Sequence, residues 1–334
     1  MTFRLILMVL GLGSLTPTGL LPQSALSPAD RARLAEVTRL VASLAERIWP
    51  GWQVTPFALL LVTDSAEYLL GHPRPTSEFG SPLFDSMLGM DVRSRPRVFA
   101  PTLLATFPAV GGLPTIVVGT AERTGKSSTD WVLTLLHEHF HQWQYSRPDY
   151  YRRAEELELA AGDSSGMWML NYPFPYDSGA VQAAARKLAR ALARALDTGP
   201  RRRRPAIQAV IRARAALAEH LTAAETRYLE FQLWQEGVAR FIEYTAAELA
   251  SRSHRPGTAY KSLSDYTPYA NVSRQNRLTL KRELHQLDLG KNRRISFYSL
   301  GAAYALLLDS TQPGWKQVYE STPFVMTALL KAGE

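Results

Sequence analysis

Five consecutive residues, His137 to His141, constrain the fold of this chain more than any other feature. They read His-Glu-His-Phe-His, so two histidines stand four residues apart and a glutamate follows the first. On an α-helix, residues i and i+4 share one face about one turn apart, so His137 and His141 can aim at one cation. Glu138 then projects beside that cation. The spacing predicts a helix that carries a metal site.

The sequence around this motif is typical of a helix. Ser127 to Asp130 offer N-cap hydroxyls and an early acid. Apolar residues follow at helical spacing, and neither glycine nor proline interrupts before Pro148. A strand-like run, Thr115 to Thr120, comes just before the helix. His139 lies about 200° round the helix from His137, so we expect it to support the site or the core and not to bind the metal.

A catalytic zinc takes three protein ligands and keeps one position open, so the chain must supply a third ligand. Short spacings do not provide it. A metzincin would have glycine and histidine where this chain has Gln144 and Arg147. The thermolysin and short aminopeptidase spacings would place a glutamate where the chain has Ala161 and Ala160. The third ligand is therefore expected farther along the chain.

The best candidate is Glu236, in the segment Glu236-Gly237-Val238-Ala239. Trp234 precedes this segment, and Phe241 and Glu243 follow it. Here the chain resembles the gluzincin metallopeptidases, in particular the peptidase MA-like proteins and the M1 aminopeptidase family. In those families the glutamate of a Glu-Gly-x-Ala segment is the third zinc ligand. Glu243 is open to two readings: a surface carboxylate, or a group that orients a zinc-bound histidine.

Two further segments are similar to these families and follow the same chain order. His141-Gln142-Trp143 looks like the end of the active-site helix of M1 enzymes. The segment from Tyr298 to Ala302 resembles a Tyr-x-x-Gly-Ala segment whose tyrosine stabilises the oxyanion. A core aromatic is the alternative role for Tyr298, and Tyr304 and Tyr260 are further candidates for the oxyanion role.

The resemblance implies a zinc metallopeptidase that hydrolyses peptide bonds. Zn²⁺ would be held by His137, His141 and Glu236, with Glu138 as the general base that activates a zinc-bound water. Tyr298 would share the charge of the oxyanion with the zinc. Two other functions stay open: hydrolysis of a non-peptide substrate at the same zinc site, and a zincin-like binding domain without catalysis.

Two departures from the families limit what can be carried over. Residues 142–235 separate the two zinc-ligand motifs by 94 residues, which we interpret as a helical insertion. The stretch from Gly111 to Pro114 also lacks the acid with which M1 enzymes bind the amino terminus of the substrate. Aminopeptidase specificity is therefore unsupported, and endopeptidase action or another way of recognising a chain end is favoured.

The first 25 residues resemble a signal peptide, with one basic residue before an apolar run from Leu5 to Leu12. We expect a secreted or periplasmic protein with no stable membrane span after cleavage; an uncleaved N-terminal anchor is the alternative. The net charge is +8, and four arginines, Arg201 to Arg204, suggest a solvated loop between helices. No interleaved aromatic and basic pattern points to nucleic acid. A peptide or protein substrate is the expected partner, and the oligomeric state stays open.

These patterns together predict an α+β, zincin-like (thermolysin-like) fold, mostly helical with a small N-terminal sheet. Residues 26–334 form the metallopeptidase domain. Residues 28–48 and 222–250 are expected helices, and residues 54–62 and 98–100 are expected strands. The stretch 71–96, rich in Pro, Gly, Ser and Arg, is expected to be an exposed loop.

Overall fold

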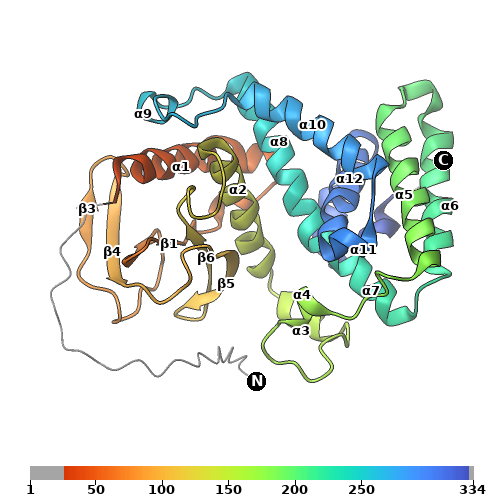
Figure 1. Cartoon of the computed structure of the whole chain (residues 1–334), viewed down its shortest axis with the longest axis horizontal. Coiled ribbons are helices and arrows are strands. Elements are labelled where there is room, and N and C mark those ends of the chain that lie inside the picture. The colour runs from red at the N-terminus through yellow and green to blue at the C-terminus, as the bar shows by residue number, and fades with distance from the viewer. Residues whose placement is uncertain (1–25, 331–334) are drawn as a thin grey trace. The chain divides into compact units, whose positions relative to one another are not determined.

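The computed structural model describes residues 26–330, which divide into two compact units (Figure 1). The first unit comprises the described residues up to Ser146 together with Leu249–Tyr269. The second comprises Arg147–Glu248 and the described residues from Ala270 onward. The predicted signal peptide, residues 1–25, lies outside the described part. The fold is α+β and mostly helical, with one small sheet near the N-terminus, as the sequence predicted.

The first unit contains a six-stranded sheet in the order β3-β4-β2-β1-β6-β5. The parallel pair is β1 with β6, and the other neighbours are antiparallel. Strands β3 and β5 are therefore the two edges. The strands are β1 (Leu59–Val62), β2 (Ala66–Leu70), β3 (Leu83–Asp85), β4 (Met90–Pro96), β5 (Leu104–Val110) and β6 (Leu113–Gly119).

Both faces of this sheet are covered at its centre, because every residue of β1 is buried. Side chains alternate between the faces of a strand. Leu60 and Val117 belong to one face, where they pack with Phe79 from a loop. The direct partners Thr106 and Ile116 point to the other face, and there helix α2 packs along β5 and β6.

Two long helices, α1 and α2, lie in the first unit. α1 (Pro28–Ile48) begins as predicted, with Ser27 as N-cap and proline in its first turn. α2 (Ser128–Tyr145) carries the histidine motif, and its N-cap Ser127 accepts a hydrogen bond from the amide of Asp130 at 3.2 Å. A second cap comes from far along the chain: the Asp265 carboxylate accepts from the amide of Ser128 at 2.8 Å. Side-chain acceptors thus satisfy the backbone N–H groups of Ser128 and Asp130 in the first turn of α2.

Strands β5 and β6 form a hairpin with a two-residue turn at Gly111 and Gly112. Their φ angles are 54° and 70°, which glycine adopts without a steric penalty. The turn therefore accounts for the two consecutive glycines at these positions. The edge strand beside α2 is β5, since β6, the strand directly before the helix, is paired on both sides.

Three predictions for this part of the chain were wrong in whole or in part. The strand expected over residues 54–62 is confined to β1, because Val54 ends a short 3-10 turn (Trp52–Val54). The stretch 71–96 is not one loop, because it contains β3 and β4; its polar side chains suit a strand near the sheet edge, where one face meets water. Residues 98–100 are not a strand. The preceding strand, β4, ends at Pro96, and the next strand, β5, starts at Leu104.

The second unit is helical in every element that the structure describes. α5 and α6 pack together, and α12 packs against both α5 and the short π-helical segment η2. The stretch 142–235 contains the end of α2, then α3 to α7 and most of η2. The helices with their bounds are α3 (Tyr150–Glu155), α4 (Trp168–Asn171), α5 (Gly179–Asp197), α6 (Pro200–Ala218), α7 (Ala223–Gln232), η2 (Leu233–Gly237), α11 (Leu289–Asn292), α12 (Ser296–Thr311) and α13 (Trp315–Ser321).

Two longer helices contribute residues to both units, α8 (Val238–Ser253) and α10 (Tyr269–His285). The short α9 (Thr258–Lys261) lies between them in the chain. Residues 201–204 were predicted to be a loop, but they form the first turn of α6. Proline at the first helical position starts that helix directly after α5 ends.

Candidate metal centre

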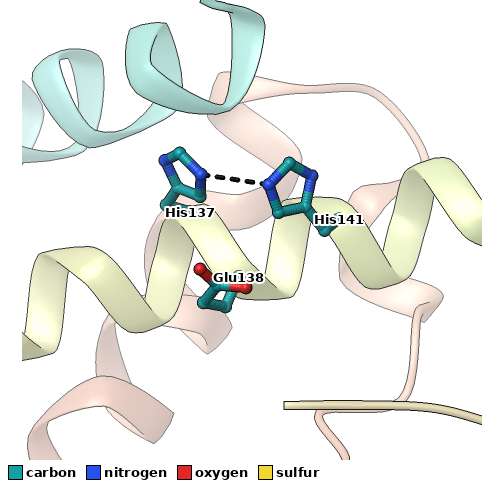
Figure 2. Close-up of side chains that lie close together, drawn as sticks. All are labelled: His137, Glu138 and His141. Carbon is teal, nitrogen blue, oxygen red and sulfur yellow. Dashed lines mark hydrogen bonds between the residues drawn. The ribbon is translucent and has the colours of Figure 1, made fainter. Parts of the chain in front are cut away.

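His137 and His141 face each other from one side of α2 (Figure 2). Their Nε2 atoms are 3.0 Å apart, and both side chains are buried. Two ring nitrogens at this separation need a proton or a cation between them, because two lone pairs would repel. Tetrahedral zinc with Zn–N bonds of about 2.05 Å would hold two nitrogens roughly 3.3 Å apart. The observed spacing is therefore close to that of two zinc ligands.

Gln144 determines which nitrogen of His141 can bind a metal. Its Oε1 lies 2.6 Å from His141 Nδ1. An amide oxygen only accepts, so Nδ1 carries the proton and the Nε2 lone pair is left for a cation. Metal-binding histidines are commonly oriented in this way by a hydrogen bond to the other nitrogen.

Glu138 completes a cluster that fits a metal ion: one ligand atom from each of His137, Glu138 and His141 lies within 4.8 Å of the others. The Glu138 carboxylate is oriented by Thr106 on the edge strand β5. The Thr106 hydroxyl lies 2.7 Å from Oε2 of Glu138 and 3.1 Å from its backbone oxygen. A strand residue thus holds the expected general base in place.

His139 belongs to the core of the first unit. Its ring contacts Trp52 and Phe57, and its Nδ1 lies 2.9 Å from Gln142 Oε1. Complete burial lowers the pKa of His139 to about 4, so the ring is neutral near pH 7. Gln142 in turn donates to the backbone oxygens of Ala58 and Pro114. The expectation that His139 is a supporting residue is confirmed.

The second unit brings Glu236 and Tyr298 together. Arg294 Nη1 donates to Glu236 Oε1 at 3.1 Å and to the Tyr298 hydroxyl at 3.0 Å. Burial, and next the negative charge of Glu236, raise the pKa of Tyr298 well above its ordinary value. The phenol therefore keeps its proton, as a hydrogen-bond donor must. Arg294 was not anticipated from the sequence, although it is one helical turn before Tyr298.

Glu236 lies in η2, a single π-helical turn in a stretch predicted to be one regular helix. π-turns are rare and are frequent at functional sites. Gly237 explains why the chain tolerates glycine there: a Cβ on Gly237 would lie 2.3 Å from the Cα of Gly301. Two motif glycines thus let η2 and α12 approach closely, which places Glu236 and Tyr298 on adjoining segments.

The remaining candidates take other positions. Glu243 lies 3.5 Å from Arg240, one turn earlier on the same helix. The Tyr260 hydroxyl donates to Thr129 Oγ1 at 3.2 Å and so supports the start of α2. Tyr304 is a fully buried core residue of α12. These positions favour Tyr298 over the other two tyrosines for an oxyanion role.

The sequence-predicted residues thus fall into two groups, His137, Glu138 and His141 in the first unit and Glu236 with Tyr298 in the second. Thr106, Gln144 and Arg294 were missed. Gln144 had a signal, since it lies three residues after His141 on the same helix.

None of the helices within residues 26–330 combines the length and the apolar character that crossing a membrane requires. A scan of protein-family models and searches of curated proteins and of solved structures each return no match to this chain.

Proposed function

We propose that this protein is a zinc-dependent peptidase of the gluzincin type. The observation that carries the proposal is the pair of buried Nε2 atoms of His137 and His141, which face each other at 3.0 Å beside Glu138. Helical spacing explains why the residues converge, but it does not explain why three polar side chains are buried together. Burying imidazole and carboxylate groups is costly even when they have hydrogen-bond partners, and a cation bound among these three side chains would offset part of that cost.

The donor set fits zinc, which prefers imidazole nitrogens and carboxylate oxygens in a four-coordinate site. His137 and His141 would be two ligands, and Glu236 is proposed as the third. When bound, zinc polarises a carbonyl group and lowers the pKa of water. The Gln144 hydrogen bond to Nδ1 of His141 supports this choice, since it prepares Nε2 to act as a ligand.

The side chains have distinct roles in the proposed hydrolysis. Glu138 takes a proton from the attacking water and later gives a proton to the leaving amine. Thr106 holds the Glu138 carboxylate in one orientation while this happens. Tyr298, which stays protonated, donates a hydrogen bond to the oxyanion that forms at the substrate carbonyl.

A peptide is the favoured substrate because the residue that orients Glu138 belongs to an edge strand. Among the strands within residues 26–330, β5 pairs with β6 alone, so its other side offers backbone groups for pairing. An extended peptide that adds to such an edge gains main-chain hydrogen bonds in register with the strand. We propose further that the protein is exported, directed by residues 1–25.

The test combines zinc content with turnover of a peptide library. Wild type should bind about one zinc per chain. Glu138→Gln should keep the zinc, but its turnover rate should fall by ~10³-fold or more. Glu236→Ala should lose most of the zinc, whereas Glu243→Ala should keep it. A full zinc content in Glu236→Ala would show that a residue other than Glu236 is the third ligand.

The turnover assay separates the alternatives. Normal cleavage by Glu138→Gln would disprove the general-base role. Hydrolysis of esters or sugar amides without peptide cleavage would replace the peptidase with a hydrolase of another substrate class. Zinc without any turnover would favour a binding domain.

A further inference from the structure

The positive charge of this protein is concentrated in one helical hairpin. We define the α5–α6 hairpin as residues 179–218, which contain nine arginines, one lysine and a single acidic residue, Asp197. The hairpin therefore carries a net charge of +9, whereas the whole chain carries +8. All the rest of the chain is close to neutral. Such a concentration of one sign gives a strong local field that attracts anions.

Most of these cations face solvent without a partner. Seven are exposed, and within the described part of the chain none of their side chains makes an ion pair or a hydrogen bond. Asp197 does not neutralise them, because its carboxylate pairs with Lys281 Nζ of α10 at 2.6 Å. The seven exposed cations are Lys187, Arg190, Arg194, Arg201, Arg202, Arg204 and Arg212.

Five of the seven exposed cations form two stripes, and Arg202 and Arg204 lie at other angles round α6. On α5, Lys187, Arg190 and Arg194 fall within a sector of roughly 60° at 100° per residue. On α6, Arg201 and Arg212 lie about 20° apart by the same geometry, three turns from each other. The two helices pack against each other and are antiparallel (Figure 1). Arg194 near the end of α5 and Arg201 at the start of α6 are seven residues apart in the chain, so cations of both helices are present at the end of the hairpin where α5 ends and α6 begins.

The start of α6 is electrostatically unfavourable without an anion. Arg201, Arg202 and Arg204 stand in or beside its first turn, which contains no acidic residue. The helix macrodipole places partial positive charge there, so cations destabilise this end and anions stabilise it. A phosphate group would meet both the positive end of the helix dipole and the guanidinium groups. The arginines therefore destabilise the start of α6 in the isolated protein, and binding of an anion would relieve this destabilisation.

We propose that the α5–α6 hairpin docks on the phosphate groups of an anionic phospholipid bilayer. A bilayer offers many phosphates close together, so it can meet several of the seven exposed cations at once. Residues 179–218 contain no aromatic residue, so the surface lacks the stacking platforms typical of single-strand nucleic-acid binding. Alanines between the arginines let the headgroups approach the helices closely. This proposal does not depend on the peptidase activity.

The experiment measures binding of the purified full chain to vesicles by co-sedimentation. Vesicles of phosphatidylcholine alone are compared with vesicles that also contain phosphatidylglycerol, at about 0.1 M and about 1 M salt. We expect binding only to the anionic vesicles at low salt. Each basic residue near such a surface contributes roughly a fivefold factor, so Arg201→Gln/Arg202→Gln/Arg204→Gln should bind about a hundredfold more weakly.

A matched control removes three exposed charges from α10 by Arg274→Gln/Arg277→Gln/Arg282→Gln, and its binding should change less than about threefold. An equal loss in the control would overturn the proposal in favour of net charge alone. Failure of the wild-type protein to bind anionic vesicles would also overturn it. Displacement of the protein from the vesicles by duplex DNA at the same salt concentration would overturn it as well. Circular dichroism should show both variants folded, with the melting temperature of the α6 variant equal to or above that of wild type.

Discussion

The hydroxyl of Thr106 lies 2.7 Å from the carboxylate of Glu138 and 3.1 Å from the backbone oxygen of the same residue. A hydroxyl has one proton and two lone pairs, so it can donate to the ionised carboxylate or accept from the protonated one while it donates to the backbone. Both protonation states of Glu138, the proposed general base, can thus be held in the same orientation. Thr106→Val keeps the shape but loses this contact, and we expect kcat to fall about tenfold with KM nearly unchanged.

The control for this prediction is Thr106→Ser, which keeps the hydroxyl and should restore most of the activity. Zinc content should be the same in both variants, since Thr106 touches no proposed ligand. A Thr106→Val protein with wild-type kcat, or a Thr106→Ser protein as slow as Thr106→Val, would show that Thr106 serves only the packing of β5.

Gln144 should control metal affinity through His141. Gln144→Leu removes the acceptor for Nδ1, and we expect zinc affinity to fall by about 10- to 100-fold. Gln144→Glu keeps an acceptor for Nδ1 and should therefore bind zinc at least as tightly as wild type. Competition with a chromophoric chelator measures the constants. Equal zinc affinities of wild type and both Gln144 variants would contradict the proposal that His141 binds zinc through Nε2 with its ring oriented by Gln144.

The close approach of Gly237 and Gly301 predicts that neither position tolerates a side chain. A Cβ on Gly301 would lie 2.5 Å from the Cα of Gly237, so Gly301→Ala forces η2 and α12 apart. We expect a loss of about 3 kcal/mol in the free energy of unfolding. Gly179→Ala is the control, since an added Cβ there meets nothing within 4 Å. Urea denaturation of both variants measures the difference; a neutral Gly301→Ala would mean that the helices separate easily.

Glu36 should make stability depend on pH in the acid range. Burial acts to raise the pKa of this carboxyl, but hydrogen bonds outweigh burial and hold it below its ordinary value of 4.5. Those bonds come from the side chains of His254 and Arg39 and from the Gly257 amide. Because the folded-state pKa lies below the unfolded one, this contribution is complete above about pH 4.5 and is lost as the pH falls through the folded-state value.

Glu36→Gln should therefore cost about 2 kcal/mol of stability at pH 7 and should flatten the fall in stability below pH 4.5. Denaturant unfolding at a series of pH values gives both quantities. A variant whose stability falls with acid as steeply as that of wild type would assign the pH dependence to other carboxylates, such as Asp265, whose pKa is also lowered, chiefly by its hydrogen bonds to Ser128 against the effect of burial.

The helix with the histidine motif was predictable because its signals are local. Ser127 caps it, apolar residues repeat at helical spacing, and the four-residue interval of the histidines has meaning only on a helix. Glycine is unfavourable within a helical stretch, and the close approach of Gly237 to Gly301 supplies the packing reason for it at this position.

The misses concern contacts between distant segments. Thr106 lies on the helix-facing side of β5 because of its register with Ile116, and no local pattern shows which strand will neighbour α2. Composition likewise misplaced residues 201–204: four arginines after a proline resemble a solvated loop, yet proline also begins helices, and here it begins α6. The π-turn at Glu236 has no sequence signature, because it depends on how η2 meets α12.

The cap that Asp265 provides has a consequence for biogenesis. Its hydrogen bond to the amide of Ser128 joins residues 137 positions apart, and the Thr129 hydroxyl donates to the backbone oxygen of Thr267, 138 positions away. On the ribosome, α2 therefore emerges long before the residues that anchor its first turn. The first turn of α2 therefore lacks these two hydrogen bonds until residues 147–248 have also been made, so the start of the helix that carries the histidines gains its full set of contacts only late in synthesis.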